Sequence, residues 1–152
     1  IRGARGVWVD EQCRTWAANV YAAGDCTTLP SVHYERRVRL ESVDNAVEQG
    51  KTAAASMCGK PARHAHVPWF WSDQYDVKLQ IAGLSEGYDQ AVVRGDPDAG
   101  SFALYYLARG ELLAVDAVNS MRDFMTGKKW IAERKHPDAN KLADTTIDLK
   151  TI

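Results

Sequence analysis

The sequence predicts an α+β fold, in which an antiparallel sheet plus helix follows the last part of an α/β unit. Three observations support this. Residues 42–58 have helical apolar spacing, residues 60–66 form a basic segment with a proline, and beyond it apolar and polar residues alternate as in strands. We therefore expect two domains, at residues 1–65 and 66–152.

Two short strands are expected before the helix. Residues 7–9 are apolar and end at an aspartate, and residues 19–23 form a second apolar run closed by Gly24 and Asp25. The second run is short and flanked by turn-forming residues, so we interpret it as a buried strand with Asp25 at its carboxyl end. The polar segment 27–37 contains a proline and is expected to be a loop.

The helix at 42–58 has clear start and stop signals. Ser42 is a suitable N-cap, and Gly59 and Pro61 end the run. Apolar side chains at helical spacing predict one apolar face. The residues of that face are Val43, Val47, Ala54 and Met57.

The second domain has the pattern of a small sheet followed by a helix. Strands are expected at residues 77–81, 91–93, 102–107 and 112–118, with the last two joined as a hairpin. A last helix, capped by Asn119 or Ser120, extends to about Glu133. The polar tail that follows has three apolar docking points: Leu142, Ile147 and Leu149.

Composition excludes several function classes. A net charge of −1 and a pI near 6.5 give no electrostatic support for binding to nucleic acid or a membrane surface. No apolar run approaches a membrane span, and no signal-peptide pattern is present. Cys13, Cys26 and Cys58 follow no metal or redox spacing, so we expect buried, reduced thiols in a cytoplasmic protein.

Two features before residue 50 indicate a ligand site. A carboxylate after Gly24, at a strand end, can accept hydrogen bonds from sugar-alcohol hydroxyls, although a plain turn has the same sequence. The segment Glu41-Ser42-Val43 opens the helix, whose free N–H groups can hold an electron-rich carbonyl. The alternative is an ordinary capped helix with Glu41 in solvent.

The stretch Trp69-Phe70-Trp71-Ser72-Asp73-Gln74 combines flat π surface with hydrogen-bonding groups. A planar heteroaromatic ligand such as a flavin or nicotinamide needs this combination, although a core strand with one interfacial tryptophan is also possible. The four histidines lack metal spacing, and the serines lack a nucleophile context, so no metal site and no catalytic side chain is predicted.

In order and spacing these elements resemble the C-terminal portion of FAD-dependent, NADH-using ferredoxin reductases. Those enzymes are components of P450 and ring-hydroxylating dioxygenase systems. The Gly-Asp step alone would fit many flavin-disulfide-reductase relatives, but the matching segments together are specific. The resemblance extends over residues 9–15, 19–25, 39–50, 67–75, 83–89 and 113–119.

The resemblance implies how an FAD would be held. Asp25, after Gly24, would bind its ribityl or pyrophosphate region. Val43 and the backbone beside Ser42 would face the pyrimidine edge of the isoalloxazine ring.

The resemblance also implies a nicotinamide side of the site. Trp69 and Trp71 would line the flavin, with Trp71 beside the nicotinamide and Glu41 close by. The reaction would be hydride transfer from NADH to flavin, followed by two single-electron steps to a [2Fe–2S] ferredoxin. The cofactor supplies that chemistry, so no side-chain acid or base is required.

One departure from the family is large. The two Gly-x-Gly-x-x-Gly fingerprints for FAD and NADH are missing, and Gly3-Ala4-Arg5-Gly6 does not match them. The chain also starts at Ile1 without a methionine. We therefore expect a fragment that alone neither binds FAD tightly nor reduces a ferredoxin.

Two alternatives stay open. The chain could act as a docking or dimerisation module, through exposed sheet edges, or it could be an apoptosis-inducing-factor-like flavoprotein, which shares the Phe70-Trp71-Ser72-Asp73 step. Basic residues that could meet an acidic ferredoxin are Lys51, Lys60, Arg63, Lys128 and Lys129.

Overall fold

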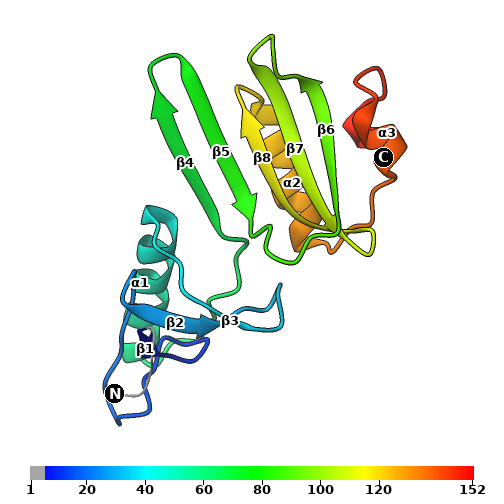
Figure 1. The fold of residues 1–152 in the computed structure, drawn as a ribbon. Coiled ribbons are helices and arrows are strands. Elements are labelled where there is room, and N and C mark those ends of the chain that lie inside the picture. Colours follow the sequence, from blue (N-terminus) through cyan, green and yellow to red (C-terminus); the bar gives the residue numbers. More distant parts are fainter. Residues whose placement is uncertain (1–5) are drawn as a thin grey trace. The chain divides into compact units, whose positions relative to one another are not determined.

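The computed structural model describes residues 6–152, so the predicted mismatch at Gly3 to Arg5 lies outside the described residues. The chain has two compact units, Ile1–Pro68 and Trp69–Ile152, which are described separately (Figure 1). Within the described part, no helix has the length and apolar character needed to cross a lipid bilayer.

The first unit has a small three-stranded sheet and one long helix. Strand β1 (Val7–Trp8) pairs parallel with β2 (Thr27–Pro30), which pairs antiparallel with β3 (Arg37–Val38). Helix α1 (Val43–Met57) follows (Figure 1). Ser42 is its N-cap, as predicted, and the Ser42 hydroxyl accepts a hydrogen bond from the Asn45 N–H at 3.2 Å.

The predicted strand at 19–23 is wrong. This run makes only one isolated bridge, between Tyr21 and Arg14, and Val20 is exposed. The strand is β2, inside the segment predicted to be a loop. At the start of β2, the Val7 N–H donates to the Cys26 carbonyl oxygen at 2.7 Å. Pro30 has no N–H to donate, but this is tolerated at the end of a strand.

The predicted apolar face of α1 is also not its buried face. Val43, Val47 and Met57 are 61%, 46% and 61% exposed. The buried residues of α1 are Asn45, Gln49 and Ala53. Two amide side chains can be buried here because each bonds to backbone of a neighbouring loop, as when Asn45 Nδ2 donates to the Leu40 carbonyl at 2.9 Å.

The second unit contains an antiparallel sheet and a helix, as predicted, with a fifth strand and a short second helix that were not predicted. Its strands are β4 (Trp69–Gln74), β5 (Val77–Gly83), β6 (Gln90–Asp96), β7 (Ser101–Ala108) and β8 (Glu111–Val118), in the order β4-β5-β8-β7-β6. Helix α2 (Met121–Ala132) packs on β5, β7 and β8, and α3 (Ala139–Ala143) lies beside β6 (Figure 1). A short 3₁₀ turn, Leu149–Thr151, ends the chain.

The predicted hairpin between β7 and β8 is confirmed. Arg109 and Gly110 form its two-residue loop with φ of 51° and 83°. Positive φ at both positions is typical of a type I′ turn, which matches the twist of the paired strands. The local sequence therefore places the turn, and a register shift between Tyr106 and Leu107 changes the pairing by one residue beyond it.

Arg94 fixes the C-terminal segment. Its side chain is 8% exposed and donates to three backbone carbonyl oxygens, those of Leu142, Asp144 and Ile147. Leu142 and Leu149 are buried, at 0% and 2% exposed, which confirms them as docking points. A predicted polar tail is thus part of the folded unit.

Gly127 lets α2 approach the sheet closely. A Cβ at this position would lie 2.4 Å from Val115 Cγ1. We expect Gly127→Ala to lower the free energy of unfolding by about 1–3 kcal/mol, because the added methyl overpacks a core contact. Urea unfolding would measure this.

The matched control is the other helical glycine, Gly50 in α1, around which a Cβ would meet no atom within 4 Å. Gly50→Ala is expected to raise the free energy of unfolding by about 0.5–1 kcal/mol through helix propensity. Equal changes in the free energy of unfolding for Gly127→Ala and Gly50→Ala would contradict the close contact between Gly127 and Val115.

Candidate functional site

The predicted carboxylate lies on a tight turn formed by residues 24–27, the 24–27 turn. The Thr27 N–H donates to the Gly24 carbonyl oxygen at 3.0 Å, and Gly24 has a φ of 83°. The Asp25 side chain is exposed at the first central position of the turn. Asp25 therefore precedes strand β2, and does not end a strand as predicted.

The 24–27 turn packs against the N-terminal half of α1. A Cβ added to Gly24 would lie 3.7 Å from the Ala46 Cβ, and the Gly24 N–H donates to Gln49 Oε1 at 2.6 Å. Val43, one turn before Ala46, is exposed at the start of the helix. The fold thus brings Gly24, Ser42 and Val43 near one end of α1.

These residues offer groups of the chemical kinds that hydroxyls and a ring carbonyl bind. An exposed carboxylate such as that of Asp25 accepts hydrogen bonds from hydroxyls, and the first N–H groups of α1 carry a partial positive charge that suits a ring carbonyl. The exposed Val43 side chain offers apolar contact. Glu41 is exposed and forms an ion pair with Arg39 at 2.9 Å.

The two predicted tryptophans stack on each other in β4, an edge strand. The Trp69 and Trp71 ring centroids are 5.1 Å apart at 29°, and Trp69 also contacts Phe124 of α2 at 5.7 Å. Lys128 Nζ lies 5.0 Å from the Trp69 ring centroid, a cation–π geometry. Trp71 is 38% exposed, so an indole face remains available to a ligand.

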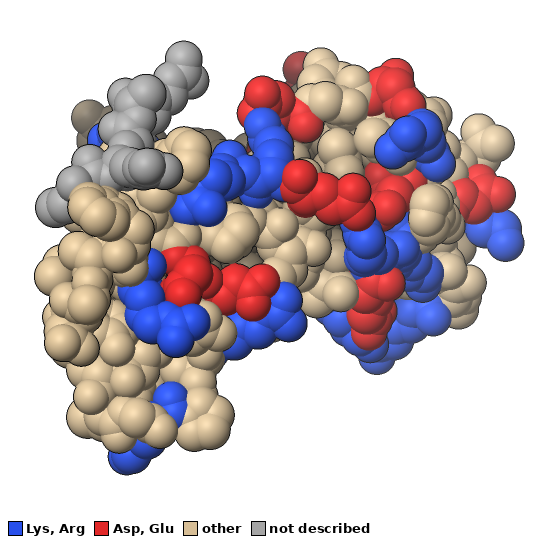
Figure 2. Space-filling view, turned by 90° about the horizontal axis from the view of Figure 1, so that it is seen from below, with Lys and Arg blue, Asp and Glu red and all other residues tan. Residues whose placement is uncertain are grey.

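Most of the basic residues proposed for a ferredoxin surface have acidic neighbours. The salt bridges are Lys51–Glu48, Arg63–Glu11 and Lys129–Glu133. On the face drawn in Figure 2, basic and acidic side chains alternate in small groups and do not form one large patch of either sign.

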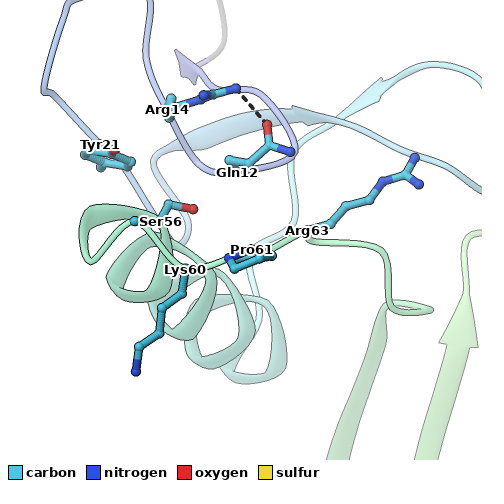
Figure 3. Close-up of a pocket in the computed structure, with 9 residues that line it drawn as sticks. Gln12, Arg14, Tyr21, Ser56, Lys60, Pro61 and Arg63 are labelled. Carbon is cyan, nitrogen blue, oxygen red and sulfur yellow. Dashed lines mark hydrogen bonds between the residues drawn. The ribbon is translucent and has the colours of Figure 1, made fainter.

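A cavity of about 730 Å³ in the first unit is lined by none of the predicted cofactor-binding residues. Its lining residues are Gln12, Arg14, Tyr21, Ser56, Gly59, Lys60, Pro61, Ala62 and Arg63. Arg14 bonds to Gln12 and Asp10, while Lys60 and Arg63 extend away from each other (Figure 3). The cations do not converge, so this cavity is a weak candidate for anion binding.

The histidines form local contacts. His66 Nε2 lies 2.7 Å from Asp44 Oδ2, and the His64 and His66 rings meet edge to face at 4.5 Å. Burial, together with the neighbouring His66, lowers the pKa of His64 to about 4. Among residues 6–152, no three His, Cys, Asp or Glu side chains are grouped as metal ligands.

Only one of the three cysteines is buried as predicted. Cys13 is fully buried, and burial raises the pKa of its thiol to about 11. Cys26 and Cys58 are exposed because one lies in the 24–27 turn and the other at the end of α1.

Comparison with protein-family models identifies the second unit. Residues 69–152 match the family described as "Reductase C-terminal". The chain belongs to this family. Residues 1–50 also match the family "Pyridine nucleotide-disulphide oxidoreductase", in the unit that contains the 24–27 turn.

Known relatives of this reductase family are longer than the chain. It is 44% identical to the 5,5'-dehydrodivanillate O-demethylase ferredoxin reductase subunit of Sphingobium, over 99% of the chain and 37% of that relative. It is 43% identical to putidaredoxin reductase of Pseudomonas putida, over 97% of the chain and 35% of that protein. The chain thus spans just over a third of these relatives.

Solved structures agree with this assignment. The covalent putidaredoxin reductase–putidaredoxin complex matches with a TM-score of 0.92 and 42% identity, over 98% of the chain and 36% of the solved chain. A ferredoxin reductase from Rhodopseudomonas palustris matches with a TM-score of 0.92 and 38% identity, over 99% of the chain and 37% of the solved chain.

Sequence reasoning missed Gln49 altogether, and it named Lys128 only as a basic residue that could meet a ferredoxin. Gln49 binds the 24–27 turn, and Lys128 lies over Trp69. The first had a signal, because Asn45 and Gln49 place two amides four residues apart on one helix face. The second had none, since α2 and β4 are distant in sequence.

His64 makes the stability of the first unit depend on pH. Its folded-state pKa, about 4, is below the ordinary value of 6.5, so the unfolded chain binds the proton more strongly. We expect the free energy of unfolding to fall as pH drops through this interval and to level off below it. The opposing charges nearby are the carboxylates of Asp44 and Glu48.

Urea unfolding at several pH values, with a signal that reports on the first unit, would measure this change in the free energy of unfolding. His64→Leu should flatten the dependence, whereas His136→Leu, at an exposed position, should leave it unchanged. A His64→Leu variant with the same pH profile as the parent would show that another group is responsible.

Proposed function

We propose that, in a chain of the relatives' length, these residues form the C-terminal part of an oxidoreductase that passes electrons from NADH through FAD to a [2Fe–2S] ferredoxin. The observation that supports this most directly is the exposed Asp25 carboxylate on a turn hydrogen-bonded to Gln49 of α1. The family match of residues 69–152 and the ferredoxin reductases among the relatives agree with it.

In this proposal the first unit binds and orients the flavin. Asp25 accepts hydrogen bonds from the ribityl or pyrophosphate region, and the N–H groups at the start of α1 face the pyrimidine edge of the ring. Val43 packs on the ring edge. FAD, when bound, supplies the hydride and single-electron chemistry, so these residues act by position and charge.

The second unit would supply the nicotinamide side. Trp71 is partly exposed, and its ring stacks on Trp69, which Lys128 also contacts. Such a supported aromatic surface can exclude water and orient a planar ring. Glu41, exposed beside the start of α1, is the proposed polar group on the nicotinamide side.

The proposed partner is a [2Fe–2S] ferredoxin that serves a P450 or ring-hydroxylating dioxygenase. One relative was solved as a covalent complex with putidaredoxin, which supports a protein partner of this kind. The proposed compartment is the cytoplasm, because the three cysteines form no disulfide.

Asp25→Ala in the full-length reductase tests the flavin site. Loss of a charged hydrogen-bond acceptor should raise the Kd for FAD by about 10- to 100-fold. Flavin-fluorescence titration of FAD-depleted protein would measure it.

The control is Asp76→Ala, which removes an exposed carboxylate from the loop between β4 and β5. This variant should bind FAD like the parent. An unchanged Kd for Asp25→Ala, or an equal loss for Asp76→Ala, would refute the assigned role.

A second candidate function is docking or self-association of the chain on its own. The observation that favours it is the exposed apolar face of α1, where Val43, Val47 and Met57 are each at least 46% exposed. Apolar faces of this kind usually mark a covered surface.

If this face mediates self-association, the 152-residue chain should form dimers or larger species at micromolar concentration. The double variant Val47→Lys and Met57→Lys should shift it towards monomer. Val93→Lys, at an exposed β6 position, is the control. Sedimentation velocity would measure the species, and a monomer at all concentrations would exclude this function.

A further inference from the structure

We propose that Gln49 is a positioning residue of the flavin site, because it fixes the 24–27 turn, and with it the Asp25 carboxylate, on helix α1. This inference rests on the proposed function. It adds a residue with no expected contact to the cofactor, since the Gln49 side chain is completely buried.

The contacts of Gln49 join three segments of the first unit. Its Oε1 accepts the Gly24 N–H at 2.6 Å, and the Thr27 hydroxyl lies 2.8 Å from the same oxygen. Its backbone carbonyl lies 3.6 Å from the Cys13 thiol. One residue of α1 therefore binds both ends of the 24–27 turn and the loop that precedes it.

These contacts determine where Asp25 points. The Gly24 carbonyl accepts the Thr27 N–H at 3.0 Å and lies 2.8 Å from the Thr27 hydroxyl. Between these fixed ends lie only Asp25 and Cys26, both exposed. Two residues between fixed ends have little backbone freedom, so the anchor at Gln49 fixes the place from which the Asp25 side chain extends.

The Gln49 amide is not the side chain that would stabilise this position most. Its Nε2 is buried without a hydrogen-bond partner, as is Asn45 Oδ1. A buried polar atom without a partner costs about 1–3 kcal/mol, which an apolar side chain of the same shape would avoid. A glutamine is nevertheless present where its oxygen can reach the Gly24 N–H. This favours a role in positioning the 24–27 turn.

The test uses full-length reductase with Gln49→Met, which keeps the length of the side chain but removes the acceptor. In FAD-depleted protein, hydrogen exchange at residues 24–27 should speed up relative to the parent. The Kd for FAD should rise about tenfold, the effect of one to two lost hydrogen bonds.

Leu29→Ala is the matched control, since it cuts a 2% exposed side chain in β2 of the same unit. It should lower the melting temperature at least as much, yet leave the Kd for FAD within threefold. Should Gln49→Met fail to fold, Thr27→Val is the second variant, because it removes the hydroxyl beside Gln49 Oε1. Thr27→Val should also speed up hydrogen exchange at residues 24–27 and raise the Kd for FAD, each by a smaller factor than Gln49→Met.

Unchanged exchange at 24–27 in the glutamine variant would overturn the proposal, as would an equal loss of FAD affinity in Leu29→Ala. Faster exchange with an unchanged Kd would show that the turn is anchored by Gln49 but does not serve the flavin. Failure of the proposed function is distinguishable, because the parent protein itself would then bind no FAD.

Discussion

The first unit depends on a helix that buries its amide side chains and exposes its apolar ones. Asn45 and Gln49 face inward and bond to backbone groups of neighbouring loops, while Val43, Val47 and Met57 face outward. One polar atom of each amide is paired with a backbone group of a loop, while Asn45 Oδ1 and Gln49 Nε2 have no partner. The loops around α1 must therefore hold fixed positions, and the 24–27 turn is one of them.

The same constraint explains the geometry of the candidate site. Asp25 is exposed, but both ends of its turn are bonded, so the carboxylate is presented by a rigid frame. The turn packs against Ala46 of α1, because the same helix carries its anchor Gln49. A charge held in this way needs no reorganisation to accept a hydroxyl, which is how a binding site gains affinity from preorganisation.

In the second unit, one buried cation holds a loop segment in place, as Gln49 does in the first unit. The Arg94 guanidinium donates hydrogen bonds to backbone carbonyl oxygens of the C-terminal segment. Its Nε lies 3.5 Å from Asp123 Oδ1. Tyr105 donates to that carboxylate at 2.7 Å. On the other face, burial raises the pKa of Asp116, which accepts a hydrogen bond from Tyr106. Polar pairs thus sit on both faces of the sheet.

Much of the architecture was predictable from local patterns. Ser42 marked the start of α1, and the Arg109-Gly110 step marked the β7–β8 hairpin, because capping and turn geometry depend on neighbouring residues only. The strand at residues 19–23 was wrong since apolar composition alone does not show where backbone partners lie. The true strand, β2, is defined by its pairing with residues 7–8.

The sequence by itself predicted helices α1 and α2, four strands of the antiparallel sheet and the residue types of the candidate site, including Asp25 and the two tryptophans. Only the tertiary structure decided which face of α1 is buried and that Gln49 holds the 24–27 turn. The reason is physical: periodicity reports which side chains share a face. Whether that face is buried depends on hydrogen-bond partners from distant segments, which no local pattern contains.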